Sequence, residues 1–306
     1  MKISFIAIVF NEESSIKSLL ESVFSQSQVP DEIIIVDGGS TDKTVLEISN
    51  FKIPTGAKIK LIFKKGNRSV GRNEAIKNAS NEIIVCSDAG CILEKNWVKD
   101  ITDPFKDPKI DVVAGYYRGI GKTVFEKCLI PYVLVMPDRV NVDNFLPATR
   151  SMAFKKSVWK EVGGFDEKLS HNEDYVFAKK LKKINANIIF EKKAIVYWTP
   201  RSNIKDAFVM FYRFALGDAQ AKIFRPKVIF IFLRYILGFF ILSLFFADKF
   251  ISLNLLLILI SVYIIWSIAK NLKYVWEISA LYYFPLIQVI SDFAVMLGTI
   301  CSLLSF

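Results

Sequence analysis

The sequence predicts an α/β domain built on a doubly wound, mostly parallel sheet and followed by a C-terminal α-helical membrane region. Short apolar runs rich in β-branched residues alternate with amphipathic stretches, as strands and helices do in such folds. The runs are nearly continuous, which is typical of strands buried on both faces. Composition then changes after Lys227, where long stretches carry almost no charge. We therefore expect a soluble domain over residues 1–227 and a membrane domain over residues 228–306.

The expected elements of the soluble domain follow one another along the chain. Residues 12–26, for example, predict a helix because their apolar side chains recur with helical spacing. In chain order the elements are strand 3–10, helix 12–26, strand 32–39, helix 44–51, strand 58–65, helix 70–80 and strand 82–90. Ligands of such sheets bind beyond the carboxyl ends of the strands, which is where Asn11, Asp37 and Asp88 fall.

Three stretches of the membrane domain are candidate spans, at about 228–247, 250–269 and 280–301. A spanning helix needs about 20 apolar residues, and the first two stretches meet this requirement with one charge, Arg234, and none. The third contains Pro285 and Asp292, which also suit a helix packed inside a bundle or one that re-enters. We therefore expect two to three transmembrane helices.

Basic residues flank the outer ends of the first two spans, whereas the turn Asp248-Lys249 between them is neutral. An excess of lysine and arginine marks the cytoplasmic side. The sequence therefore predicts a multi-pass protein of the cell membrane with a cytoplasmic soluble domain.

The net charge of +10 indicates which partners to expect. The chain has no basic stripe interleaved with aromatic residues and no recognisable nucleic-acid module, so nucleic acid is not an expected partner. Attraction to anionic membrane lipids and to phosphorylated substrates fits a chain with a membrane region.

Five motifs occur in the order and spacing of family 2 glycosyltransferases: "FNEE" (10–13), "VDGGSTDKT" (36–44), "GRNEAIKNA" (71–79), "SDAGC" (87–91) and "GGFDE…HNEDYVFAKKL" (163–181). Over residues 1 to about 220 the chain resembles this family. The resemblance implies a GT-A fold and an inverting hexosyltransferase that uses a nucleoside-diphosphate sugar. It also implies that Asn11, Glu12, Asp37, Arg72 and Asp88 bind this donor.

Two of these donor residues also have simpler explanations. The glycines after Asp37 let the backbone approach a ligand, and the Ser/Thr/Asp cluster that follows can cap a helix with Asp42 in its first turn. The alternative for Asp37 is a solvated aspartate on a capped turn. For Arg72, at the loop end of a helix, the alternative is placement on the surface.

The metal site implied by the resemblance is incomplete in this sequence. The family motif is Asp-x-Asp, and its second acid binds Mg²⁺ or Mn²⁺ on the diphosphate. Here that position is Gly90, so Asp88 is the one candidate ligand of the motif and metal use is in question. His171, the only histidine, is a conceivable further ligand or an ordinary loop or core residue.

The acidic pair Glu173-Asp174 opens a predicted helix that Asn172 can cap. Acidic residues are common at helix N-termini because the helix dipole stabilises them. The resemblance implies a catalytic role for the pair, with Asp174 as the general base for the acceptor hydroxyl.

Processive members of the family carry a later Gln-x-x-Arg-Trp, and here Arg213 stands without the glutamine and the tryptophan. This favours transfer of a single sugar. Arg213 is a candidate for holding phosphate on the acceptor side, with a plain basic membrane flank as the alternative. The apolar segment 123–137 is either core or an interfacial element on the bilayer, and we expect the latter.

The expected function is therefore a membrane-anchored glycosyltransferase that acts on a lipid-linked or glycan acceptor. Two alternatives stay open. One is a polyprenyl-phosphate glycosyltransferase, whose anionic acceptor needs no base. The other is an inactive GT-A domain that serves as a membrane scaffold.

Overall fold

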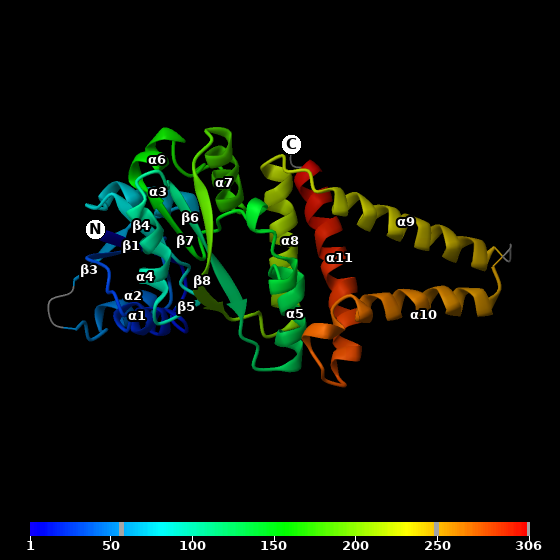
Figure 1. Cartoon of the computed structure of the whole chain (residues 1–306). Helices are drawn as coiled ribbons and strands as arrows, with labels where there is room; N and C mark the ends of the chain where they lie inside the picture. The colour runs from blue at the N-terminus through cyan, green and yellow to red at the C-terminus, as the bar shows by residue number, and fades with distance from the viewer. Residues whose placement is uncertain (55–57, 248–250, 305–306) are drawn as a thin grey trace. The chain divides into compact units, whose positions relative to one another are not determined.

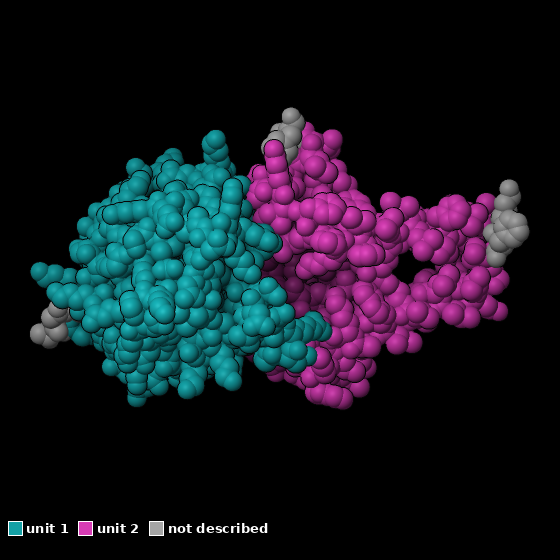
Figure 2. Space-filling view, turned by 45° about the horizontal axis from the view of Figure 1, so that its top comes forward, with its two compact units in different colours: residues 1–119, 135–199 teal, residues 120–134, 200–306 magenta. Residues whose placement is uncertain are grey.

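A computed structural model describes residues 1–54, 58–247 and 251–304. The chain divides into two compact units, which Figure 2 colours separately. The first comprises residues 1–119 and 135–199, and the second comprises residues 120–134 and 200–306.

The first unit is built on an eight-stranded sheet with the order β3-β2-β1-β4-β7-β6-β8-β5 (Figure 1). Its strands are β1 (Ile3–Val9), β2 (Glu32–Asp37), β3 (Ile59–Phe63), β4 (Ile83–Cys86), β5 (Cys91–Leu93), β6 (Val112–Gly119), β7 (Met152–Lys155) and β8 (Ile188–Trp198). The first four strands run parallel, and β7 lies antiparallel between β4 and β6. The predicted α/β, mostly parallel sheet is confirmed.

Helices cover both faces of this sheet, as the nearly continuous apolar strands predict. Phe5 of β1 packs on one face with Trp97, and the neighbouring Ile6 packs on the other with Ile76 and Phe177. The helices of this unit are α1 (Ile16–Phe24), α2 (Thr44–Ser49), α3 (Arg68–Asn78), α4 (Trp97–Thr102), α6 (Lys156–Glu161) and α7 (Glu173–Lys183), with 3-10 turns at Asp103–Lys106, Pro137–Arg139 and Val142–Asn144.

The second unit is helical. It contains α5 (Val124–Val133), α8 (Ile204–Gln220), α9 (Pro226–Phe246), α10 (Leu253–Ala269) and α11 (Ala280–Leu304), with a 3-10 turn at Leu272–Tyr274. Among the described residues, the stretches Pro226–Phe246, Leu253–Tyr274 and Ala280–Leu304 are helical, long and apolar enough to cross a membrane. The three predicted spans are therefore helices of the expected length, while the turn predicted at Asp248-Lys249 lies outside the described residues.

Two segments that composition alone places in the soluble domain belong to the second unit. Figure 1 shows α8 running alongside α11, and the C-terminal part of the second unit begins at Pro200, whereas the change in composition falls after Lys227. Helix α5, from the segment 123–137, packs on α11 through Phe125, whose ring lies 5.7 Å from that of Tyr283. This helix is therefore not part of the sheet's core, and its position at a bilayer surface stays a prediction.

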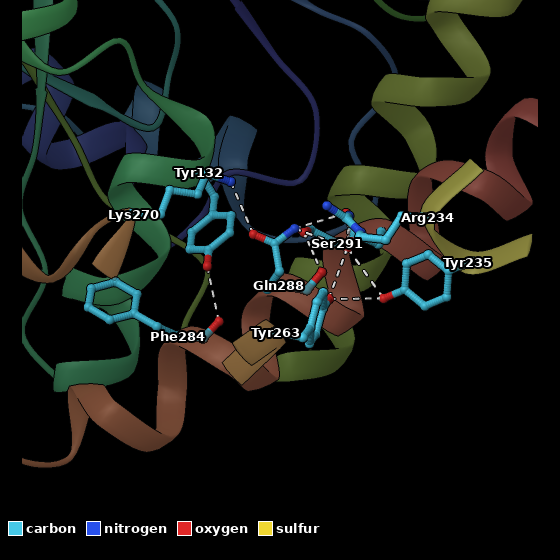
Figure 3. Close-up of polar contacts among 9 residues, drawn as sticks. Tyr132, Arg234, Tyr235, Tyr263, Lys270, Phe284, Gln288 and Ser291 are labelled. Atoms are coloured by element: carbon cyan, nitrogen blue, oxygen red, sulfur yellow. Dashed lines mark hydrogen bonds and ion pairs between the residues drawn. The ribbon is translucent and has the colours of Figure 1, made fainter. Parts of the chain in front are cut away.

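A polar network holds the apolar helices of this unit together (Figure 3). The buried Asp292 of α11 accepts hydrogen bonds from Arg234 of α9 at 2.5 Å and from the amide of Gln288 at 3.0 Å. The hydroxyls of Tyr235 and Tyr263 donate to the same carboxylate at 3.3 and 3.4 Å. A charge inside apolar helices is tolerated when it is paired in this way. Asp292 therefore lies inside a bundle, one of the two placements that the sequence suggests for it.

Close packing of α11 on α8 depends on Gly298. A Cβ atom at this position would lie 2.4 Å from the carbonyl oxygen of Tyr212 and 3.0 Å from Cβ of Ala215. We expect Gly298→Leu to lower the melting temperature in detergent, because overpacking of this kind costs about 1–3 kcal/mol. Gly238→Leu on α9 is the matched control, since a Cβ there meets no atom of the described residues within 4 Å. Equal melting temperatures for the two variants would contradict this packing.

Candidate active site

The loops after β1 and β2 are tied together at the carboxyl edge of the sheet. Asn11 adopts a left-handed backbone with φ of 55°, which asparagine tolerates better than most residues. Its side-chain oxygen accepts from the backbone N–H of Thr41 at 2.8 Å, and its own N–H donates to Ser40 at 2.9 Å. The backbone N–H of Glu12 donates to Thr44 at 2.6 Å. The two predicted residues Asn11 and Glu12 thus shape the loop that carries Asp37.

Asp37 ends β2 with a buried carboxylate, so the solvated placement is wrong. One of its oxygens accepts from the backbone N–H groups of Gly39 and Ser40, each at 3.0 Å. Gly39 has φ of +104°, a conformation that favours glycine. Because a carboxylate has about four acceptor positions, this turn leaves Asp37 able to accept from a ligand. Asp42 precedes the helix and does not lie in its first turn, because α2 begins at Thr44.

Arg72 brings three of the predicted site residues together. It lies in the second turn of α3, is 3% exposed, and is therefore not a surface residue. Its guanidinium donates to Asp88 at 3.0 Å, beyond the end of β4, and also to Glu173 at the start of α7. Packing of three elements around one guanidinium thus builds an acidic site at the sheet edge.

The charges around Asp88 favour its ionised form. Burial alone would raise the pKa of this carboxyl, but the guanidinium groups of Arg72, Arg150 and Arg68 outweigh burial and hold the pKa below its usual value. Asp88 is the most accessible member of the ion-paired group, with 37% of its side chain exposed, against 4% for Arg72 and for Glu173.

Asp174 differs from its neighbour Glu173. Burial raises the pKa of Asp174, and the negative charges of Glu173 and Asp88 raise it further against the opposing effect of Arg72. Asp174 is half-buried, whereas Glu173 is enclosed and bonded to Arg72. Of the two acids, Asp174 is therefore the one available to take a proton from a ligand. Asn172, expected to cap this helix, has φ of 57°, and its side chain makes no capping hydrogen bond.

Arg150 is a site residue that the sequence motifs do not indicate. It lies just before β7, and because β7 is antiparallel to β4, with Met152 opposite Cys86, the start of β7 lies beside the end of β4. Its Nε lies 4.0 Å from a carboxylate oxygen of Asp88. Only knowledge of this antiparallel pairing places Arg150 here, since no periodicity or motif marks it.

The donor set around Asp88 does not fit a divalent metal ion. Asp88 accepts from Arg72 at 3.0 Å and from Thr149 at 3.4 Å, and a second guanidinium, that of Arg150, flanks it. Burial raises the pKa of the nearby Cys86 thiol to about 12, so this side chain is a neutral thiol beside Asp88. No group of three His, Cys, Asp or Glu side chains able to hold a metal occurs among the described residues. The predicted extra ligand His171 contacts Ser170 at 2.8 Å.

Arg213, the predicted residue of the acceptor side, lies exposed on α8 in the second compact unit. Its role stays a prediction.

Comparisons with known proteins agree on one family. The sequence profile described as Glycosyl transferase family 2 matches residues 4–156. Poly-beta-1,6-N-acetyl-D-glucosamine synthase of Staphylococcus epidermidis is 27% identical over 227 residues, which are 71% of this chain and 55% of that protein. O-antigen chain rhamnosyltransferase RfbN of Salmonella typhimurium is 25% identical over 236 residues, which are 68% of this chain and 71% of that protein. The chain thus spans about half the length of the synthase that it matches.

Solved structures show the same fold. S. aureus TarS 1-349 in complex with UDP is 25% identical, with a TM-score of 0.52 over 71% of this chain and 65% of that chain. Mannosyltransferase PcManGT from Pyrobaculum calidifontis, in complex with GDP-Man and Mn²⁺, has a TM-score of 0.71 over 99% of this chain and 87% of that chain. At 14% identity this second likeness concerns the fold alone.

Proposed function

The chain belongs to glycosyltransferase family 2, and we propose that it transfers one sugar from a nucleoside diphosphate to a hydroxyl of a lipid-linked acceptor, with inversion. The observation that carries this proposal is the ion-paired group of Arg72, Asp88 and Glu173 at the sheet edge, with Asp174 adjacent to Glu173 in the chain. Asp37, Asn11 and Glu12 support the donor side of that site.

The proposed reaction is a single displacement. The acceptor oxygen attacks the anomeric carbon of the sugar, and its proton passes to the carboxylate of Asp174. The bond between the anomeric carbon and the diphosphate oxygen breaks, and the nucleoside diphosphate leaves with the electron pair. Because attack and departure occur on opposite faces, the configuration inverts. A base whose pKa is raised toward neutral pH suits this proton transfer.

Arg72 acts mainly on other residues in this proposal. Its guanidinium is shared between Asp88 and Glu173, so it orients Asp88 for the ribose and keeps Glu173 away from the reacting atoms. Asp88 then contacts the donor directly, as its exposed fraction allows.

In this proposal the second unit anchors the protein in the membrane and contacts the acceptor. Its three long apolar helices support membrane anchoring, and the missing Gln-x-x-Arg-Trp supports transfer of a single sugar. Helix α5 and Arg213 are candidates for contact with membrane lipid and with the acceptor's phosphate.

The pH dependence of transfer follows from Asp174. We expect the rate to fall as pH drops through the raised pKa of this carboxyl, because the protonated form cannot accept the acceptor's proton. Glu173→Gln removes a neighbouring negative charge and leaves more of Arg72's charge to act on Asp174. This change should therefore move the acid limb of the pH–rate profile to lower pH. An acid limb that stays in place would show that another group titrates.

The proposed orientation is tested at the turn between the first two spans. With basic residues flanking the outer ends of those spans, we expect the sheet domain in the cytoplasm and Lys249 on the opposite side. A membrane-impermeant thiol reagent should then label Lys249→Cys in intact cells. Labelling only from the cytoplasmic side would show that the topology is the opposite of the one proposed.

Ligand binding tests the function itself. Full-length protein in detergent is heated with a panel of nucleoside diphosphates and their sugars. A ligand that binds only the native state stabilises it by about 2.7 kcal/mol at one hundred times its Kd, so at least one pair of donor and diphosphate should raise the melting temperature. If no member of the panel does so, the inactive scaffold becomes the better description.

A further inference from the structure

We propose that Arg150 forms a subsite for the donor's diphosphate and carries the role that a divalent cation has in the Asp-x-Asp members of the family. This inference rests on the proposed function, since it concerns the leaving group of the same reaction. It starts from the disagreement between the metal that the family implies and the residues around Asp88.

The guanidinium of Arg150 is held in place by two aromatic rings. Its Cζ lies 5.3 Å from the ring centroid of Tyr117 on β6 and 5.1 Å from that of Trp198 at the end of β8. Such rings attract a cation and restrict its rotamers. Arg150 is 21% exposed, so its side chain is preorganised at the site and can still meet a ligand.

One hydrogen-bond donor of Arg150, its Nε, is buried and has no acceptor among the described residues. The distance of 4.0 Å to Asp88 is too long for a hydrogen bond. Buried donors in native proteins are almost always paired with protein, water or a ligand, so this Nε can donate to an anionic ligand. A planar fork of N–H groups matches phosphate oxygens.

Arg150 and Arg72 differ in how far neighbouring carboxylates neutralise their charges. The charge of Arg72 is balanced by direct bonds to two carboxylates, Asp88 and Glu173. Among the described residues, the one carboxylate paired with Arg150 is Asp88, at the longer distance of 4.0 Å, so Arg150 keeps more of its charge for an anionic ligand. The oxygens of a diphosphate bound beside Arg150 would accept hydrogen bonds from its guanidinium and neutralise that charge.

Gly90 offers a direct way to test this exchange of a cation for an arginine. It stands where the family motif has its second carboxylate, and a Cβ there meets no atom of the described residues within 4 Å. Gly90→Asp therefore has room for its side chain and restores the missing metal ligand. The wild-type chain has Arg150 but no carboxylate at position 90.

The experiment is calorimetric titration of full-length protein in detergent with UDP and GDP, in EDTA and in Mn²⁺. We expect the wild type to bind at least one nucleotide with the same affinity in both conditions. Arg150→Met should weaken this binding about 10- to 100-fold, the range for losing a charge-assisted hydrogen bond. Arg118→Met, which removes an exposed arginine of β6, is the matched control and should bind like the wild type. Gly90→Asp should bind more tightly in Mn²⁺ than in EDTA.

Further arms separate the other outcomes. Arg150→Lys keeps the charge but loses the fork, so intermediate binding by this variant supports the proposal even if Arg150→Met does not fold. Farnesyl phosphate serves as an anionic acceptor probe, and a loss confined to it would move Arg150 to the acceptor side and overturn the proposal. Two results together would overturn the proposal and leave the proposed function standing. Nucleotide binding by the wild type would disappear in EDTA, and Arg150→Met would bind nucleotide in Mn²⁺ with the same affinity as Arg118→Met. Absence of UDP and GDP binding by the wild type, together with no stabilisation by any member of the thermal panel, overturns both.

Discussion

Asp174→Asn is expected to lower the single-turnover rate of sugar transfer roughly 10²–10⁴-fold, the usual effect of removing a positioned general base. Nucleotide affinity should stay nearly unchanged, because Asp174 takes no part in the bonds between Arg72, Asp88 and Glu173. Asparagine has almost the same size as aspartate, and the site is half-buried, so the fold should be preserved. Rapid-quench measurement of transfer and calorimetry of nucleotide binding give the two quantities for the same preparation.

A matched control for this variant is Asp107→Asn on an exposed turn of the same unit. Its carboxylate accepts from the backbone N–H of Lys109 at 2.9 Å, a role that an asparagine oxygen can fill. Near-native turnover of Asp174→Asn would remove the base from the mechanism. An acceptor that is already anionic, such as a polyprenyl phosphate, would then explain the reaction better.

Arg72→Met is expected to cost the sheet domain about 3–5 kcal/mol of stability, the range for removing one partner of a buried ion pair. The reason is Glu173, which is 3% exposed and would be left as a buried charge without its partner. For a domain of this size, 1 kcal/mol corresponds to about 2–4 °C, so the melting temperature should fall by roughly 6–20 °C. The measurement is thermal unfolding of the purified protein at neutral pH.

Two further variants separate loss of the ion pair from loss of an arginine as such. Arg118→Met removes an exposed arginine and should change the melting temperature little. The double variant Arg72→Met with Glu173→Gln should recover part of the loss, because neither partner then carries an unpaired charge. If Arg72→Met melts at the temperature of Arg118→Met, the ion pair does not hold these elements together.

The sequence predicts the grouping of Asn11, Asp37 and Asp88 because local rules decide it. Parallel strands bring their carboxyl ends to one edge, so the positions of Asn11, Asp37 and Asp88 after three such strands are enough to group them. The helix that carries Glu173 and Asp174 is predicted by its apolar spacing and begins where expected. In contrast, the burial of Arg72 is a tertiary effect, since it depends on carboxylates 16 and 101 residues away in sequence.

The parts that the sequence does not predict depend on long-range pairing. Arg150 reaches the site through an antiparallel strand, although the motifs around it belong to a parallel sheet. Helix α5 leaves the sheet domain to pack on α11 through contacts such as Tyr132 with the carbonyl of Phe284, which no local pattern encodes. The second unit likewise includes α8, which packs closely against Gly298 of α11 although its composition resembles that of the soluble domain.

The most direct test of the central claim, transfer of one sugar to a lipid-linked acceptor, is mass spectrometry of the lipids after reaction. Full-length protein in nanodiscs is incubated with the sugar nucleotide that raises its melting temperature and with a lipid extract of cells that express it. We expect one lipid-linked species to gain the mass of a single sugar residue, with one nucleoside diphosphate released per product. The same gain should be absent or strongly reduced with Asp174→Asn. A ladder of added sugars, or release of nucleoside diphosphate while no lipid gains mass, would rule out transfer of a single sugar to a lipid-linked acceptor.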